Sequence, residues 1–182
     1  MYSLISPKHV KHKKVLVLYI GKYLDGIRDG VKKSFRGAGL AYIKHMIDTV
    51  YLYLFDINRF SHIILHFGTI DVQKYSVDVT TCKFRNLIYR VRRKNPDISI
   101  SISSVLPRPT DVHILGEKVV AINNRLVRIC KEEQVQFIKY FRRFLHQGKP
   151  RRDLFSIRDA LHLYDAGGLQ LKLSFMHVIS HL

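Results

Sequence analysis

The chain has only two cysteines in 182 residues, and this scarcity excludes a disulfide-stabilised scaffold. Cys82 and Cys130 also lack the spacing of metal ligands, and His66 and His113 have no neighbouring Cys or carboxylate in a metal-binding pattern. We therefore expect neither a metal nor a cofactor. Reduced, buried cysteines favour an intracellular protein, in the cytoplasm or the nucleus.

Long hydrophobic runs are also missing. The most apolar stretch, "TVYLYLF" at 49–55, is far shorter than the roughly 20 residues that a helix needs to cross a bilayer. The N-terminal sequence does not have the layout of a signal peptide, because its basic residues follow its few apolar ones. Repeats, low-complexity tracts and linkers are absent as well. The sequence thus predicts one domain over residues 1–182, with 1–12 as a basic N-terminal extension, and no membrane span.

Acidic residues are scarce: 14 Asp and Glu stand against 31 Lys and Arg, so the formal net charge is +17. This balance favours a polyanionic partner, RNA or DNA, because cations that neutralise phosphates release counterions. The alternative is a basic surface without a dedicated partner. The hydrophobic fraction of 47% is ordinary for a globular protein, so we expect a packed core in spite of the charge.

What the sequence does contain is a regular alternation of strand-like and helix-like segments. Strands that alternate with helices of this length favour a parallel sheet covered by helices on both faces. The predicted fold is therefore an α/β three-layer sandwich of flavodoxin-like type, with a mostly parallel sheet of roughly five strands. The expected strands are 13–20, 31–37, 61–68, 97–107 and 136–141, and the expected helices are 40–55, 79–94, 116–135 and 169–182.

Functional side chains in such a sheet gather in the loops that follow the carboxyl ends of the strands. Four short sequences occupy these places: "GKYLDG" after the first strand, "RGAGL" after the second, "GTIDV" after the third and "RDALHL" before the last helix. Their order and spacing resemble the SGNH, or GDSL-type, hydrolases, in which the corresponding blocks are Gly-Asp-Ser, a Gly, Gly-x-Asn-Asp and Asp-x-x-His. The resemblance runs from Val15 to about Ile179. Within the family, the chain is similar in particular to the esterase-like domains of animal retroelements.

The resemblance implies hydrolysis of carboxylic esters by Ser-His-Asp chemistry. It implies His162 as the general base and Asp159 as the carboxylate that orients it. An imidazole must be held in one tautomer to take a hydroxyl proton, and a nearby Asp does this. A backbone N–H at Gly37, or alternatively at Gly39, would point at the oxyanion. Without the resemblance, His162 would be interpreted as an ordinary hydrogen-bonded histidine.

Two blocks depart from the pattern of the family. Tyr23 stands at the position of the Ser nucleophile, and Ile70 stands at the position of the Asn that would donate to the oxyanion. Loss of one such donor typically lowers the rate by about 10² to 10³, and loss of the Ser removes the covalent route, so we expect impaired or absent activity. Asp71, beside Ile70, either belongs to the oxyanion loop or caps a helix. Ser103 and Ser104 lie in an alternating strand, and we interpret them as structural.

The basic residues are spread over both ends of the predicted sheet. "KHVKHKK" (8–14) and "RVRRK" (90–94) are expected opposite the site, whereas "RRFLHQGKPRR" (142–152) is expected on the same side as the site. This distribution fits general attraction to nucleic acid better than a shaped groove. The alternative function is therefore a non-catalytic nucleic-acid-binding or scaffold module of a retroelement-type protein. The candidate nucleic-acid contacts are Arg92, Arg93, Lys149, Arg151 and Arg152.

Overall fold

The computed structural model describes residues 15–19, 30–34, 37–48 and 56–182. Five strands form one sheet in the order β2-β1-β3-β4-β5, and every pair of neighbours is parallel. The prediction of a parallel five-stranded α/β fold is confirmed. The strands are β1 (Val15–Tyr19), β2 (Gly30–Ser34), β3 (His62–His66), β4 (Ser99–Ser103) and β5 (Gln136–Ile138).

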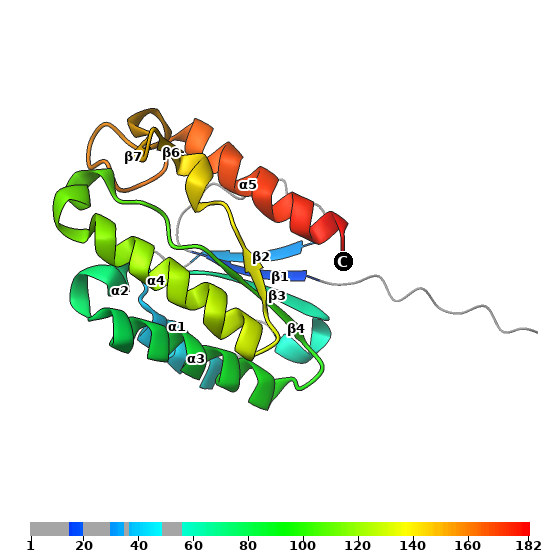
Figure 1. Cartoon of the computed structure of the whole chain (residues 1–182). Helices are drawn as coiled ribbons and strands as arrows, with labels where there is room; N and C mark the ends of the chain where they lie inside the picture. Colours follow the sequence, from blue (N-terminus) through cyan, green and yellow to red (C-terminus); the bar gives the residue numbers. More distant parts are fainter. Residues whose placement is uncertain (1–14, 20–29, 35–36, 49–55) are drawn as a thin grey trace, which may run out of the picture.

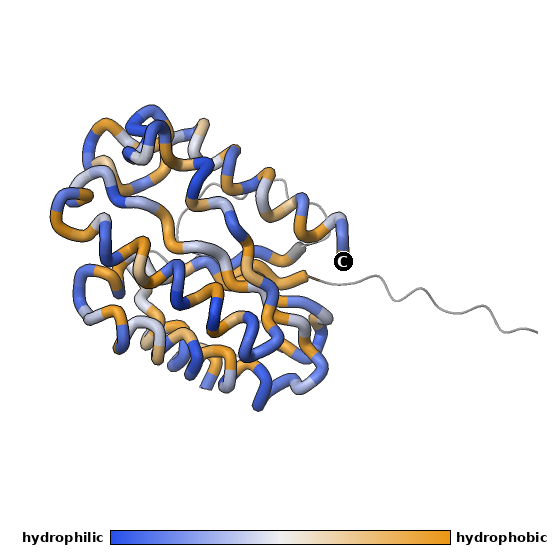
Figure 2. The backbone as a smooth tube through the Cα atoms, viewed as in Figure 1, coloured by the Kyte–Doolittle hydropathy of each residue, from blue (hydrophilic) through white to orange (hydrophobic). Residues whose placement is uncertain are grey.

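Helices cover both faces of the sheet (Figure 1). One face packs against four helices, and the other packs against the last helix. Figure 2 shows the central strands as the most hydrophobic part of the backbone, while each covering helix alternates between apolar and polar residues. The helices are α1 (Leu40–Asp48), α2 (Thr69–Lys74), α3 (Val77–Lys94), α4 (Val112–Glu132) and α5 (Asp165–Ser180). The first four share the first face. Among the described residues, no helix has both the length and the apolar character to cross a bilayer.

The sequence of β1, "VLVLY", explains its central place. Leu16 and Leu18 belong to the core cluster formed with α1, α3 and α4, whereas Val15, Val17 and Tyr19 belong to the cluster formed with α5. A parallel strand that is buried on both faces needs an apolar side chain at almost every position. β2 lies at the edge of the sheet, as its alternating sequence predicts.

Several boundaries differ from the predictions. β5 ends at Ile138 instead of residue 141, because the chain turns into the 3₁₀ helix η4 (Phe141–Phe144). α4 begins at Val112 instead of 116, and α5 begins at Asp165 instead of 169. In both helices, glycines in the first two turns lower the helix propensity and conceal the true start from a sequence pattern. The segment 49–55, part of the helix expected over 40–55, lies outside the described residues, as does the extension 1–12.

A small hairpin of β6 (Leu145–His146) and β7 (Lys149–Pro150) was not predicted. Its two-residue turn consists of Gln147 and Gly148, both with positive φ, of 49° and 78°. Two positive φ angles are what a type I′ hairpin turn requires, and its twist matches that of the strands. The hairpin carries part of the basic segment 142–152.

Candidate active site

The residues of the expected acid–base pair lie together in the loop before α5. His162 Nδ1 is 2.7 Å from Asp159 Oδ2. The other carboxylate oxygen, Oδ1, accepts hydrogen bonds from the backbone N–H groups of Leu161 and His162, both at 2.9 Å. Asp159 therefore fixes the ring of His162 and the backbone beneath it. With an ionised Asp159, Nδ1 carries the proton, and Nε2 is the nitrogen left to accept one.

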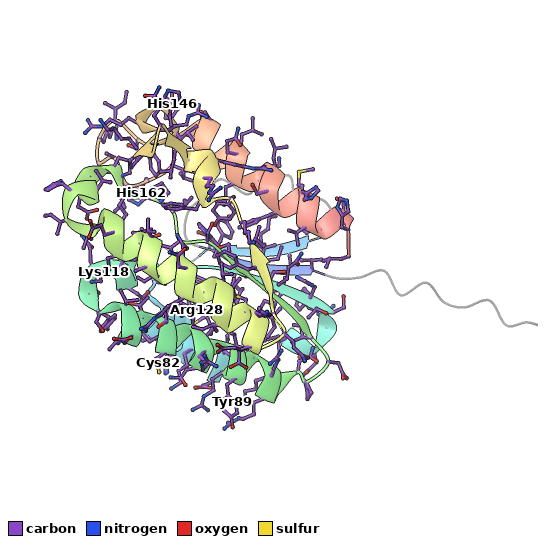
Figure 3. The ribbon with its side chains drawn as sticks, viewed as in Figure 1. Cys82, Tyr89, Lys118, Arg128, His146 and His162 are labelled. Atoms are coloured by element: carbon purple, nitrogen blue, oxygen red, sulfur yellow. The ribbon has the colours of Figure 1, made fainter. Side chains whose placement is uncertain are left out.

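The charge of Asp159 is set by its hydrogen bonds. The backbone N–H groups of His162 and Leu161, followed by the His162 ring, lower the pKa of Asp159 to about 2, so the carboxylate is ionised at neutral pH. The His162 side chain is 66% exposed and that of Asp159 is 41% exposed. Figure 3 shows His162 toward the end of the molecule where the strands finish. The imidazole is thus oriented on one side and open to solvent on the other.

Backbone hydrogen bonds within the loop hold the segment that carries His162. Ser156 donates its N–H to the carbonyl oxygen of His162 at 2.7 Å, and Ala160 donates to that of Ser156 at 2.8 Å. An antiparallel bridge joins Phe155 and Leu163, whose side chains are both buried in the core beneath α5. The loop is therefore anchored at its two ends, so the position of His162 is defined by the core.

The third block forms the tight turn between β3 and α2. Gly68 has a φ of 109°, and a Cβ at this position would lie 2.9 Å from Cγ2 of Val105. Both the backbone conformation and the lack of space therefore require glycine here. Ile70 was predicted to lie in a loop, but the structure places it in the first turn of α2, half-buried. Its side chain carries no hydrogen-bond donor.

Asp71 joins two of the predicted loops. Its side chain is only 1% exposed, and Oδ2 accepts a hydrogen bond of 2.9 Å from the backbone N–H of Leu40, at the start of α1. Burial raises the pKa of Asp71. A Cβ on Gly39 would lie 3.2 Å from the same Oδ2, so this glycine allows close packing. Of the two roles considered for Asp71, the hydrogen bond to Leu40 matches a helix cap, at the start of α1. Gly37, the other predicted residue of this region, is exposed and has a φ of 67°.

A buried arginine that was not predicted supports the same turn. Arg108 is 2% exposed; its Nη1 donates to the carbonyl oxygen of Thr69 at 2.8 Å, and its Nη2 lies 2.6 Å from Asp111 Oδ2. Sequence alone did not show that this arginine holds the backbone at Thr69, next to Ile70. Asn123 fixes the preceding backbone, because its side-chain amide exchanges two hydrogen bonds with the backbone of Val105, at 2.8 and 2.9 Å.

Ser103, the last residue of β4, and Ser104, which follows it, are structural, as predicted. Ser103 Oγ lies 2.9 Å from His66 Nδ1, and Ser104 Oγ accepts from the backbone N–H groups of Tyr140 and Phe141. The Tyr140 hydroxyl also lies 2.6 Å from His66 Nδ1. All of these side-chain groups are inside the core, so neither serine has the exposure of a nucleophile.

The structure places four of the five positions of the expected catalytic centre, namely Gly37, Ile70, Asp159 and His162. Tyr23 lies outside the described residues. In the described ranges, no three side chains of His, Cys, Asp or Glu gather to hold a metal. Of the candidate nucleic-acid contacts, Arg93, Lys149 and Arg152 are exposed, Arg151 pairs with Asp153 at 2.6 Å, and Arg92 lies against Glu133.

Comparison with known proteins gives a consistent result. No protein-family model and no curated protein matches the sequence. Solved structures do match. A GDSL-like lipase from Bacteroides thetaiotaomicron is 16% identical with a TM-score of 0.73, over 94% of this chain and 90% of that one. A member of the lipolytic G-D-S-L family from Veillonella parvula is 14% identical with a TM-score of 0.73, over 93% and 100%.

The esterase domain of the ZfL2-1 ORF1 protein from a zebrafish retrotransposon is 24% identical, with a TM-score of 0.52, over 91% of this chain and 99% of that one. These identities are low, so the likeness concerns the fold. With its strand order of β2-β1-β3-β4-β5 and its covering helices, the chain has the α/β fold of the SGNH, or GDSL-type, hydrolases.

Proposed function

We propose that the chain is an SGNH-type esterase-like domain in which the hydrolysis of carboxylic esters is impaired. The observation that supports this most directly is the pair of His162 and Asp159, with its 2.7 Å hydrogen bond and its exposed imidazole. A histidine whose only role was structural would be expected to be buried and hydrogen-bonded in the core, as His66 is. The fold adds support, since several structures that share it are named lipases or esterases.

In the ancestral reaction, His162 Nε2 would take the proton of a serine hydroxyl while the hydroxyl attacks the ester carbonyl. Asp159 would stabilise the imidazolium that forms. In this sequence the nucleophile position is Tyr23, a bulky phenol whose ordinary pKa is about 10. Ile70 offers the developing oxyanion no hydrogen bond. The base and its orienting carboxylate therefore persist without the two groups that would make use of them.

An esterase assay tests this proposal. Purified protein is supplied with p-nitrophenyl acetate and butyrate, and we expect little or no turnover. Tyr23→Ser alone is expected to restore little, and Ile70→Asn alone nothing by a covalent route. The double variant is expected to exceed the sum of the two, because nucleophile and oxyanion hole act as a unit. Lys22→Asp, which completes the Gly-Asp-Ser block, can be added to this variant.

The control is a matched pair of histidine variants in the double variant. His162→Ala is expected to abolish the recovered activity, whereas His177→Ala, an exposed histidine in the last turn of α5, is expected to leave it unchanged. Robust turnover by the unmodified chain that survives both Tyr23→Phe and His162→Ala would show that the site is wrong.

A second function, binding of nucleic acid, is favoured by the net charge of +17 and by exposed cations such as Arg93, Lys149 and Arg152. The likeness to a retrotransposon domain supports a retroelement origin for such a module. Fluorescence anisotropy with labelled single-stranded RNA and duplex DNA is the test. We expect binding that depends weakly on sequence and falls steeply with salt.

Neutralising Arg151 and Arg152 is expected to lower the affinity for all nucleic-acid sequences about equally, as for phosphate contacts. The absence of binding to RNA or DNA even at low salt would contradict this second function, without bearing on the esterase proposal.

A further inference from the structure

A cavity of about 380 Å³ lies at the end of the sheet where the strands begin. Its polar wall comes from the starts of three neighbouring strands, with His62 on β3, Ser99 on β4 and Gln136 on β5. Arg92 from α3 and Gln134 from the turn before β5 complete this wall. The volume falls within the range of about 300 to 1,000 Å³ that small-molecule sites occupy. His162 lies toward the opposite end of the strands, so the cavity is separate from the candidate active site.

The polar wall is held in place by a chain of hydrogen bonds. Ser101 Oγ donates to Gln136 Oε1 at 2.6 Å, and it lies 2.8 Å from His62 Nε2. Since the serine proton goes to Gln136, the ring nitrogen of His62 is the donor to the serine oxygen. The oxygen of the Gln136 amide is therefore engaged, and its nitrogen has no partner within the described part of the chain. Two N–H donors are left for a ligand.

Arg92 is positioned by the turn that carries Gln134. Its Nη2 donates to the carbonyl oxygen of Glu133, and its Nη1 lies 3.6 Å from Glu133 Oε2. Gln134 has a φ of 51°, in the left-handed region. The turn thus places a guanidinium and a second amide side by side at the cavity.

The remaining wall is aliphatic and includes Ile98, Ile100 and Leu182. A wall of this kind packs against the flat face of a ring, while amide side chains offer paired donors and acceptors to its edge. This combination matches a nucleobase, whose edges carry alternating donors and acceptors. A ring without hydrogen-bonding groups would make no use of these amides.

The charge near the cavity suits a phosphate. α3 ends with the cations Arg92, Arg93 and Lys94. We propose that this cavity binds a nucleotide unit, with the base against the amides of Gln134 and Gln136 and the phosphate toward Arg92 and Arg93. The unit is either a free nucleotide or one nucleotide of a single-stranded nucleic acid.

Isothermal titration calorimetry with adenosine monophosphate, uridine monophosphate and ribose 5-phosphate tests the proposal. We expect at least one nucleotide to bind about tenfold or more tightly than ribose 5-phosphate, which has the phosphate without the base. Gln134→Gly and Arg92→Gln are each expected to weaken nucleotide binding by about tenfold. Glycine tolerates the positive φ of residue 134, so Gln134→Gly removes the amide without straining the turn.

The matched control is Arg128→Gln, which removes the same charge from the exposed surface of α4 (Figure 3) and is expected to leave binding unchanged. An eight-nucleotide single-stranded RNA then identifies the source of the ligand. If the RNA displaces the nucleotide, and if the same two variants weaken the binding of the RNA, the site holds one nucleotide of a strand. If the RNA does not displace the nucleotide, the site holds a free nucleotide.

Three results would overturn the proposal. The first is that no nucleotide binds, alone or in RNA. The second is that ribose 5-phosphate binds as tightly as the nucleotides, which would leave the base without a role. The third is that Arg128→Gln weakens binding as much as the cavity variants, which would indicate attraction to the overall charge only. Urea unfolding of each variant establishes that the altered chains are folded.

Discussion

Two histidines of this chain have similar bonding but opposite surroundings. His162 is 66% exposed and hydrogen-bonded to Asp159 at 2.7 Å, whereas His66 is 4% exposed and lies 2.6 Å from the hydroxyl of Tyr140. Burial lowers the pKa of His66 to about 4 and raises the pKa of Tyr140. The buried ring is therefore kept neutral as part of the core, while the exposed ring contributes little to the core and is accessible to a substrate.

Hydrogen bonding alone consequently does not distinguish a structural histidine from one with a chemical role; solvent access does. The ring of His66 packs edge-on against Phe175 of α5, with the ring centroids 5.8 Å apart, so no substrate could reach it without displacement of that helix. The contrast predicts that the two histidines should differ in every measurement of stability.

The largest effect is expected for His66→Ala. It removes a buried ring and takes away the His66 nitrogen that lies beside the Tyr140 hydroxyl. The Ser103 hydroxyl also loses this contact but keeps its hydrogen bond to the carbonyl oxygen of Leu65. We therefore expect a loss of about 3 kcal/mol or more in the free energy of unfolding. Urea unfolding followed by circular dichroism measures it, since the chain has no tryptophan to report by fluorescence. His113→Ala, at an exposed position in α4, is the control. Similar losses in the two variants would remove the distinction.

The next effect is a dependence of stability on pH. Because the pKa of His66 falls from 6.5 to about 4 on folding, the unfolded chain takes up a proton that the folded chain refuses. This contribution is fully present above pH 6.5 and is lost as the pH falls toward 4, by about 3 kcal/mol in total. Asp159 loses its contribution only at lower pH, as the pH falls from 3.8 through its folded pKa of about 2. Urea unfolding at pH 7.0, 5.5 and 4.5 measures the slope.

His66→Asn is the variant that assigns this slope. It is expected to be less stable at pH 7 but to show a much flatter dependence between pH 6.5 and 4, because asparagine does not titrate. An unchanged slope in the variant would assign the pH dependence to other groups.

A smaller loss is expected for Tyr140→Phe. The ring packing against Phe144 and Phe175 would be retained, and only the hydroxyl that contacts His66 would be removed. We expect about 1 to 2 kcal/mol in the free energy of unfolding, as for a buried hydrogen bond with one partner left behind. Unfolding in urea measures it, with Tyr89→Phe on the exposed side of α3 as the control. A loss equal to that of the control would show that the hydroxyl is dispensable.

The smallest effect is expected for His162→Ala. The side chain is exposed, and the backbone hydrogen bonds of Asp159 to residues 161 and 162 do not depend on the ring. We expect a change within about 0.5 kcal/mol in the free energy of unfolding, as for exposed sites in general. The same urea series measures it. A loss above about 2 kcal/mol would make His162 a structural residue and weaken the proposed function.

Much of the fold could be predicted because its strands are strongly patterned. The continuous apolar sequence of β1 and the alternation in β4 each allow one arrangement, with every second side chain on the same face of the sheet. Boundaries were less accurate where the sequence contradicts the local structure, as at Gly167 and Gly168 in the first turn of α5. The hairpin at Gln147 was missed because glutamine rarely adopts a positive φ.

The candidate site was predictable where its parts are close in the sequence. Asp159 and His162 are three residues apart, and their hydrogen bond requires only the local turn. Arg108 and Thr69 are 39 residues apart, and nothing in either sequence segment indicates that they meet. The helical position of Ile70 and the capping role of Asp71 depend in the same way on contacts between distant segments.

The hydrogen bond from Leu40 to Asp71 affects which substitutions are tolerated at residue 70. Because Asp71 and Arg108 hold the backbone on either side of residue 70, that backbone does not depend on the side chain of residue 70 itself. In a library of all substitutions, position 70 should tolerate polar and apolar residues alike, while positions 71 and 108 should tolerate almost none. An asparagine could therefore be exchanged for isoleucine, or isoleucine for asparagine, in a single step and without loss of the fold.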